Sequence, residues 1–425
     1  MYEKTIKHFE KIASIPHCSF ETEKMALHVK EFAKNLGFEV KEDKAGNILC
    51  QKGNPNVCLQ SHYDMVCMGK APQIELFKED GWLRAKDSSL GADNGMGMAI
   101  MMAMMEKHDN LECLFTNNEE VGLIGANNLD LNIKSTNLLN LDSEEEGEVI
   151  IGCAGGVDIF GRIDTEKTKL DSKLNVYEVN VSGLDGGHSG IDIAKNVPNA
   201  IKVLASILVE NDCFLVDIKG GERNNSIPQK AYAKVLSKGV LSSNNPHVEI
   251  KNLNAKSDIC LKNSKNILHA INAFSQGVRI YDEELKMPLV SINFSTIKEK
   301  NGQVEFEFFA RSMRDGMLEN IKSETKSLLD GFGFKVDFKN QTPSWQPIKT
   351  NFALNVQNIS EKHVGKTKLH GIHAGLECGV IIKKQAHIKG VCSIGPTIKF
   401  PHSEREKCLL SSVEKIVNVV DEILI

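Results

Sequence analysis

The first part of the chain alternates between short apolar runs and stretches with helical periodicity. Residues 4–36 predict two amphipathic helices broken at Pro16, with Gly37 at the end of the second, since proline stops a helix and glycine commonly follows its last turn. Strand-like runs follow at residues 38–40, 47–50 and 57–62. Strands then alternate with helices up to Asp142, which predicts a mostly parallel sheet flanked by helices.

After the glycine-rich segment at 152–156 the pattern changes to strand, strand, helix and strand, and then repeats. The first round covers residues 177–181, 199–210 and 231–235, and the second covers 290–296, 304–310, 318–329 and 334–338. We therefore expect an α+β domain made of two related halves.

These patterns predict an α/β protein with an interrupted first domain. Residues 1–155 and 340–425 form that domain, closed by a helix at 409–423, and residues 156–339 are inserted into it. A chain of 425 residues is long enough for two domains.

Composition narrows the class of protein. The chain is 41 % apolar and carries a net charge of −5 with both signs interspersed, which argues against a nucleic-acid partner because such proteins need a basic face. The N-terminal residues lack the apolar core of a signal peptide, and no apolar run approaches the roughly 18 residues of a membrane span. We expect a cytoplasmic protein without a membrane partner.

The chain has 11 cysteines and no Cys-x-x-Cys pair. In a chain of this length the pattern predicts reduced cytosolic thiols, without a disulfide framework. A bound metal would then be held by histidines and carboxylates.

Ligand-type side chains follow four of the strand-like runs. They are His62 with Asp64, the adjacent pair Glu119 and Glu120, Asp142, and His402, while Asp93 lies in a glycine-rich turn at 90–95. In open α/β sheets, sites form outside the carboxyl ends of the strands, so these residues could converge. Asp64 would accept a hydrogen bond from the His62 ring. Taken alone, each motif is more typical of a solvated loop, and we expect residues 144–146 to lie mostly on the surface.

The order of the motifs resembles that of the two-zinc aminopeptidase-like metallopeptidases. Within them it is most similar to the aminoacyl-histidine dipeptidases, also called Xaa-His or cytosolic non-specific dipeptidases. The shared motifs are His-x-Asp, Gly-Ala-Asp-Asn-Gly, Glu-Glu-x-Gly, Leu-Asp-Ser-Glu, Gly-Gly-His-Ser-Gly, His-Ala-Gly-Leu-Glu-Cys-Gly at 373–379 and Ser-Ile-Gly-Pro-Thr-Ile at 393–398. The match runs from Ile15 to His402.

This resemblance implies a catalytic domain, interrupted by a lid domain, that hydrolyses dipeptides with Xaa-His or broad specificity. It implies two divalent metal ions, zinc or alternatively cobalt or manganese. Asp93 would bridge the ions, His62 and Asp142 would complete one site, and Glu120 and His402 the other. Glu119 is then left as the general base.

The resemblance also implies four substrate contacts. His188 would hold the scissile oxyanion, across a homodimer formed through the lid, and Asn225 would contact the small peptide substrate. Arg311 would clamp a carboxylate, and Glu377 would lie near the substrate's amino end.

The chain departs from the family at Asn118, Ala194 and Val197, where an Asp, a His and an Arg are usual, and this leaves the substrate preference open. Three alternatives also stay open: a tripeptidase or an N-acyl amino-acid amidohydrolase using the same site, and a non-catalytic relative that binds metal or peptide.

Overall fold

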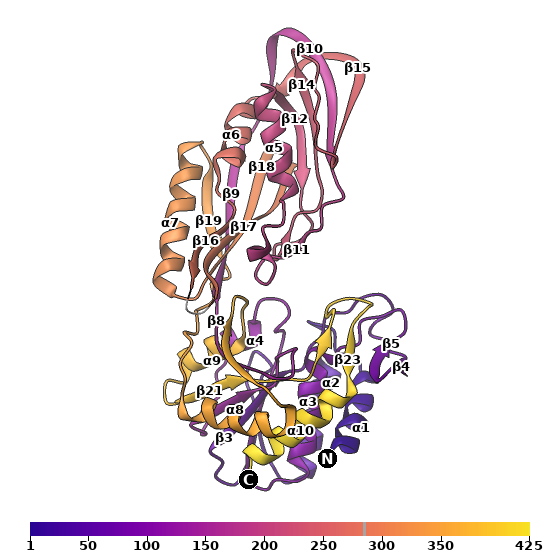
Figure 1. The fold of residues 1–425 in the computed structure, drawn as a ribbon, viewed down its shortest axis with the longest axis vertical. Helices are drawn as coiled ribbons and strands as arrows, with labels where there is room; N and C mark the ends of the chain where they lie inside the picture. The colour runs from indigo at the N-terminus through magenta and orange to yellow at the C-terminus, as the bar shows by residue number, and fades with distance from the viewer. Residues whose placement is uncertain (284–285) are drawn as a thin grey trace. The chain divides into compact units, whose positions relative to one another are not determined.

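The computed structural model describes residues 1–283 and 286–425, and the chain divides into two compact units (Figure 1). The first unit comprises Met1–Cys153, Trp345–Gly371 and Leu376–Ile425, and the second comprises Ala154–Ser344 and Ile372–Gly375. The short return of the chain at Ile372–Gly375 had no signal in the sequence. That the second unit acts as a lid stays a prediction.

The first unit is built on an eight-stranded sheet. Its four central strands run parallel in the order β6 (Leu111–Thr116), β3 (Val57–His62), β7 (Asn137–Asn140) and β21 (Gly390–Ser393). The flanking strands are β1 (Glu39–Glu42) and β2 (Ile48–Lys52) on one side, and β8 (Glu148–Cys153) and β20 (Lys368–Ile372) on the other. The predicted α/β class is confirmed, with antiparallel pairing of β1, β2 and β8 towards the edges.

Helices enclose this sheet. One apolar cluster joins the strands to α1 (Tyr2–Ala13), α2 (Glu23–Asn35), α3 (Ala92–Met105), α8 (Asn351–Val364) and α10 (Leu410–Ile423). The short helix α4 (Ile124–Asn127) packs against α9 (Glu377–Lys384) outside that cluster. Helix α3 is apolar and buried on nearly all sides, as expected for a helix in the interior of a domain.

A small sheet fixes the loop that carries His402. A hairpin is formed by β4 (Leu76–Glu79) and β5 (Trp82–Ala85), and it is extended by β23 (Lys407–Leu409) and β22 (Ile398–Lys399). Residues 400–406 connect β22 to β23, so both ends of this loop are tied to the sheet.

The second unit contains one antiparallel sheet of nine strands. The order is β15 (Val248–Leu261), β10 (Lys167–Val181), β14 (Ala231–Ser237), β12 (Phe214–Gly220), β17 (Met287–Lys300), β18 (Gln303–Ser312), β9 (Gly155–Asp164) and β19 (Lys335–Lys339), and β16 (Gly277–Asp282) also pairs with β17. Strands β12 and β17 join the two halves that the sequence pattern predicted, so both belong to a single sheet.

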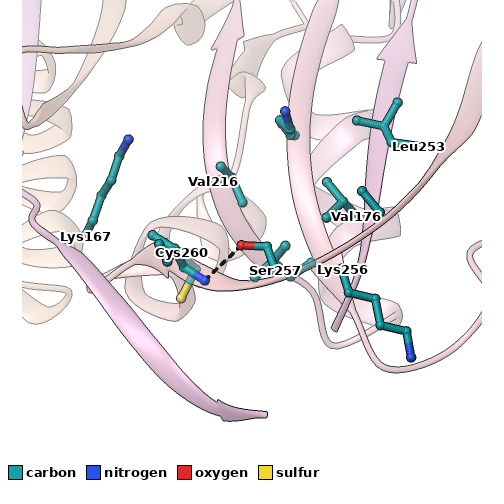
Figure 2. A pocket seen from close by; sticks show the side chains of 11 residues that line it. Lys167, Val176, Val216, Leu253, Lys256, Ser257 and Cys260 are labelled. Atoms are coloured by element: carbon teal, nitrogen blue, oxygen red, sulfur yellow. Dashed lines mark hydrogen bonds between the residues drawn. The ribbon is translucent and has the colours of Figure 1, made fainter. Parts of the chain in front are cut away.

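Three helices, α5 (Ala200–Glu210), α6 (Ser264–Ala273) and α7 (Asp315–Gly331), share the main apolar cluster of this unit with the sheet. Its centre is a group of buried rings: Phe274, Phe294, Phe306, Phe308 and Phe334. A smaller cluster around Val176, Leu236 and Cys260 lines a pocket of about 320 Å³, with Lys167 and Lys256 also in its wall (Figure 2).

Candidate metal centre

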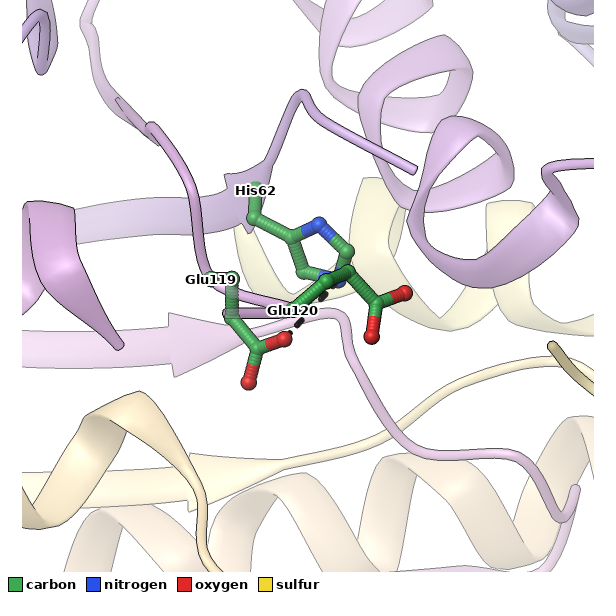
Figure 3. Close-up of side chains that lie close together, drawn as sticks. All are labelled: His62, Glu119 and Glu120. Carbon is green, nitrogen blue, oxygen red and sulfur yellow. Dashed lines mark ion pairs between the residues drawn. The ribbon is translucent and has the colours of Figure 1, made fainter. Parts of the chain in front are cut away.

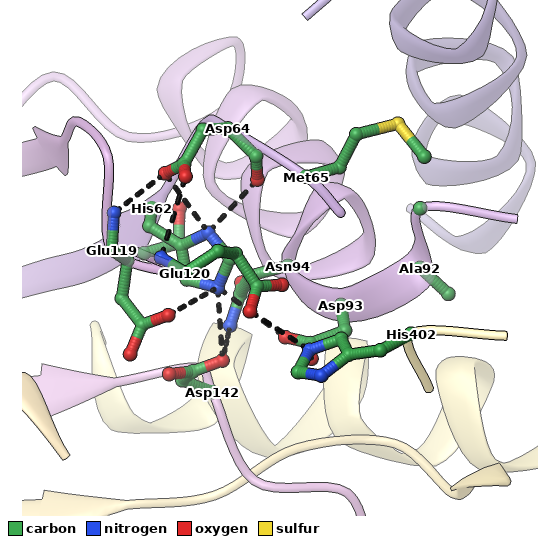
Figure 4. A network of polar contacts seen from close by, with 12 residues as sticks. His62, Asp64, Met65, Ala92, Asp93, Asn94, Glu119, Glu120, Asp142 and His402 are labelled. Atoms are coloured by element: carbon green, nitrogen blue, oxygen red, sulfur yellow. Dashed lines mark hydrogen bonds and ion pairs between the residues drawn. The ribbon is translucent and has the colours of Figure 1, made fainter. Parts of the chain in front are cut away.

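Five ligand-type side chains converge in the first unit, at the carboxyl ends of β3, β6 and β7, at the start of α3 and on the loop between β22 and β23 (Figure 4). His62 Nε2 lies 3.3 Å from Asp93 Oδ1 and 3.5 Å from Asp142 Oδ1. His402 Nε2 lies 3.0 Å from Asp93 Oδ2 and 2.8 Å from Glu120 Oε2. Asp93 therefore faces one histidine with each of its two carboxylate oxygens.

Three overlapping groups in this cluster have the composition of a metal site. Two of them, His62–Asp93–Asp142 and Asp93–Glu120–His402, share Asp93 and are the sets expected from the sequence. The third joins His62 to the adjacent pair Glu119 and Glu120, with Glu119 Oε2 3.9 Å from His62 Nε2 (Figure 3). Within each group the ligand atoms lie within 4.8 Å of one another.

The backbone around the cluster departs from regular structure. Asp93 and Asn94 have non-helical φ and ψ at the start of α3, and the peptide bond between them is cis. The Asn94 amide donates to the Asp142 carboxylate and, at 3.1 Å, to the Leu141 carbonyl. His402 has φ 56°, in the left-handed region that residues other than glycine rarely adopt. Left-handed backbone conformations at residues other than glycine, such as that of His402, tend to cluster at functional sites.

Asp64 contacts the His62 ring through its backbone carbonyl as well as through its carboxylate. His62 Nδ1 lies 3.0 Å from the Asp64 backbone carbonyl and 3.5 Å from its carboxylate, so the carbonyl is the nearer acceptor and fixes the ring with Nε2 towards the cluster. The Asp64 carboxylate also accepts the Glu119 N–H at 2.9 Å and the Ser19 hydroxyl at 2.8 Å. Asp64 thereby holds the turn that carries Glu119 and Glu120.

The segment around Ser19 is covalently tied to the loop after Asp64. Cys18 and Cys67 form a disulfide, so the prediction that the thiols are reduced is wrong for this pair, while the other nine cysteines are free and buried. Backbone bonds from Met65 N to His17 O and from Ser19 N to Met65 O bring the two segments together. The 49-residue separation gave no spacing signal, because this pairing depends on tertiary contacts.

The cluster carries a large excess of negative charge. Its carboxylates are Asp64, Asp93, Glu119, Glu120, Asp142, Glu144, Glu377 and Glu406, and within the described ranges none of them forms an ion pair with a lysine or arginine. Burial raises the pKa of Glu119 well above its usual range and the pKa of Glu120 to about 7. Burial would lower the pKa of His402, but Asp93 and Glu120 raise it to about 11.

These donors fit a metal. Buried charges need a compensating partner, and in the groups of described residues that could hold a metal the carboxylates are accompanied by His62 and His402. Glu120 Oε1 is buried and has no hydrogen-bond partner, which leaves an acceptor atom available. Imidazole and carboxylate donors match the ligands of catalytic zinc sites.

Glu144 and Glu377, two of the cluster's carboxylates, lie outside the candidate metal groups. Residues 144–146 are half-buried, where the sequence led us to expect a mostly surface position, and burial together with the charges of Asp93 and Asp142 raises the pKa of Glu144 to about 8. Glu377, the first residue of α9, is fully buried and accepts hydrogen bonds from Gln60 at 2.6 Å and from Thr116. The other carboxylate oxygen of Glu377 has no partner.

The other three expected substrate contacts lie in the second unit. Strand β11 (Gly187–His188) pairs with β13 (Ser226–Ile227), and Ser189 N donates to the Asn225 carbonyl at 2.8 Å. His188 Nδ1 accepts from the N–H groups of Gly190 and Ile191, which leaves the proton on Nε2.

Arg311 is buried near the end of β18, with its guanidinium 4.4 Å from the centre of the Phe309 ring. A Cβ added to Gly190 would lie 3.0 Å from Arg311 Nε and 3.2 Å from His188 Cε1. Gly190 therefore permits a close approach between His188 and Arg311.

Comparison with known proteins places this arrangement in a class. No protein-family model matches the chain. The cytosol non-specific dipeptidase of Escherichia coli is 34 % identical over 98 % of this chain and 96 % of its own length. The crystal structure of aminoacylhistidine dipeptidase from Vibrio alginolyticus has a TM-score of 0.79 and 29 % identity, covering 99 % of this chain and 96 % of that one. A tripeptidase from Staphylococcus aureus shares the fold at a TM-score of 0.60 and 16 % identity, covering 100 % and 98 %.

The fold and the sequence likeness place the chain among the dipeptidases, a class of hydrolases, and its acidic cluster has the composition of a metal site. The chain belongs to the cytosol non-specific dipeptidase family within that class, which confirms the resemblance read from its motifs. Among the helices of the described residues, none has the length and apolar character needed to cross a membrane.

Proposed function

We propose that this protein hydrolyses dipeptides, with Xaa-His or broad specificity, in a metal-dependent reaction. Two of its relatives are a cytosol non-specific dipeptidase and an aminoacylhistidine dipeptidase. The observation that carries the proposal is the position of Asp93, which faces His62 with one oxygen and His402 with the other. That arrangement suits a carboxylate shared by two metal ions.

We infer that the centre holds two divalent ions, zinc or alternatively cobalt or manganese. His62, Asp142 and Asp93 would hold one ion, and Asp93, Glu120 and His402 the other. When bound, the ions would polarise the scissile carbonyl and make water more acidic.

In this proposal Glu119 is the general base. Glu120 pairs with His402 at 2.8 Å, whereas Glu119 lies 3.9 Å from its nearest ion-pair partner, His62, and its backbone is fixed by Asp64. Burial raises the pKa of Glu119, which brings a carboxylate closer to the range in which it can both take and return a proton. Glu119 would take a proton from the attacking water and deliver it to the leaving amine.

Four residues would contact the substrate. His188 has its proton on Nε2 and can donate it in a hydrogen bond to the developing oxyanion, while Arg311 can bind the terminal carboxylate and Asn225 the peptide. Glu377 has a buried carboxylate oxygen without a partner, which is suited to the substrate's ammonium group.

We also propose that the protein is a cytoplasmic homodimer formed through the second unit, in which His188 serves the partner's site. The name of the relative in Escherichia coli supports the cytoplasmic location. Mixing inactive His188→Ala chains with inactive Glu119→Ala chains tests the dimer, because mixed dimers would contain one intact composite site. Recovered activity supports action across the dimer. No recovery after confirmed subunit exchange shows that His188 acts within its own chain or not at all.

A substrate panel tests the function itself. The purified protein, loaded with zinc, cobalt or manganese, is assayed against Xaa-His and other dipeptides, tripeptides and N-acyl amino acids. We expect dipeptides to have the highest kcat/KM and the metal-free protein to have no activity. Faster cleavage of tripeptides or N-acyl amino acids would favour those alternatives, and binding of peptide without turnover would favour the non-catalytic one.

A further inference from the structure

Glu406 has an unusual set of hydrogen bonds beside the metal centre. Its side chain is buried, with 3 % of the residue exposed, and it lies four residues after His402. Its Oε2 accepts the backbone N–H groups of Leu90 at 2.9 Å and Gly91 at 3.1 Å, and its Oε1 accepts those of Ala92 at 2.8 Å and Asp93 at 3.3 Å. One carboxylate thus receives four consecutive backbone donors.

The N–H groups of residues 90–93 depend on acceptors from outside their own segment. This segment begins α3, and the first N–H groups of a helix have no partner within the helix. Gly91 is the N-cap residue, with φ 69° and no side chain to accept a hydrogen bond. Asp93 and Asn94 that follow are not helical in φ and ψ, so helical hydrogen bonding does not fix the position of Asp93.

Glu406 also connects two parts of the chain that are distant in sequence. It follows the loop with His402 at the point where that loop enters β23, and its hydrogen bonds reach residues more than 300 positions earlier. Asp93 and His402, whose side chains lie 3.0 Å apart, are therefore joined a second time through Glu406.

We propose that Glu406 is a positioning residue for the metal centre, which holds the Asp93 backbone in register with the His402 loop. In that position each Asp93 oxygen faces one histidine. The inference rests on the proposed function, since it assumes that Asp93 is shared by two ions. Glu406 need not touch either ion, because it acts through the backbone of Asp93.

The test is Glu406→Gln, which keeps the size of the side chain but replaces one acceptor oxygen with an NH₂ donor. Two of the four backbone donors then lose their acceptor. We expect zinc affinity, measured by competition with a chromophoric chelator, to fall by about 10–100-fold, as is usual when a group that orients a metal ligand is lost. Glu404→Gln changes an exposed carboxylate on the same loop and should leave the affinity unchanged.

Two further measurements separate positioning from general stability. Saturating zinc should restore most of kcat in Glu406→Gln, and amide exchange at residues 90–93 should be faster than in the wild type in the metal-free state. Wild-type zinc affinity in Glu406→Gln would overturn the proposal, even if the melting temperature fell. If Glu406→Gln does not fold, Glu406→Asp, which keeps both oxygens on a shorter side chain, decides in the same way: weaker binding supports the proposal and unchanged binding overturns it. Failure of the wild type to bind zinc would instead reject the proposed function.

Discussion

The two units hold their candidate functional side chains by opposite means. In the first unit, acidic groups gather around two histidines without lysine or arginine partners in the described ranges, and residues such as Asn118 and His402 adopt left-handed backbone conformations. In the second unit, His188 is placed by the pairing of β11 with β13, and Arg311 lies against an aromatic ring beside a large apolar core. The first arrangement needs a cation from outside the chain, whereas the second is formed by the chain alone.

This difference predicts which unit responds to the loss of metal. In the metal-free protein the clustered carboxylates repel one another. This repulsion and their burial raise the pKa values of Glu119, Glu120 and Glu144. The core of the second unit consists of packed apolar side chains whose interactions do not depend on a bound ion.

Removal of the metal should have the largest effect. After treatment with a chelator, we expect activity to fall to background and amide exchange to accelerate around the first unit's cluster. Exchange in the second unit should stay unchanged, because its core contains no part of the cluster. Mass spectrometry of exchange, resolved by segment, measures both units in one sample. Adding zinc back should slow exchange in the first unit again. Equally faster exchange in both units would contradict the difference between them.

The adjacent carboxylates provide the next test. We expect Glu119→Gln to keep its metal and bind dipeptide but to lose about 10²–10⁴-fold in kcat, the usual contribution of a general base. Glu120→Gln should bind metal more weakly and regain part of its activity with excess zinc, because an amide oxygen still coordinates weakly. Metal analysis and kcat are measured for both variants. If excess metal rescued Glu119→Gln but not Glu120→Gln, Glu119 would be the metal ligand and Glu120 the general base.

A substitution in the core of the second unit tests whether that unit is stable independently of the metal centre. Phe308 lies at the centre of the second unit's aromatic cluster, 4.4 Å from Phe294 and 4.5 Å from Phe274 between ring centres. Phe308→Ala should lower the free energy of unfolding of that unit by about 3–5 kcal/mol, through lost burial and the cavity that remains. The zinc affinity of the first unit should not change. Chemical denaturation and a zinc titration check the two expectations separately.

The pH dependence of the metal-free protein gives a smaller effect. Burial raises the pKa of Glu120 and Glu406 to about 7 from the usual glutamate value of 4.5. These two groups therefore bind more protons in the native than in the unfolded state between those values, so their contribution to stability is fully present at about pH 4.5 and is lost as pH rises through about 7. Each unit of pKa difference corresponds to about 1.4 kcal/mol. Denaturant unfolding across this range should show the fall without metal and a weaker one with zinc.

The sequence predicted those parts of the structure that depend on local periodicity. Residues at strand ends, such as His62 and Asp142, could be assigned to one edge of the sheet because parallel strands end together. The disulfide between Cys18 and Cys67 and the hydrogen bonds of Glu406 could not be predicted, since these partners meet only through tertiary packing. The position of Glu406 four residues after His402 was visible, but that spacing has no meaning until the backbone of Asp93 is in place.

Metal content of Asp93→Ala tests the central claim most directly, because Asp93 pairs with His62 through one carboxylate oxygen and with His402 through the other. Elemental analysis after equilibration with zinc should show two ions per chain in the wild type. The matched variant Asp171→Ala, which changes an exposed residue of β10, should also retain two ions. Asp93→Ala should retain neither ion at the same free zinc concentration. Two tightly bound ions in Asp93→Ala would show that Asp93 does not bridge a pair of metals and would contradict the account.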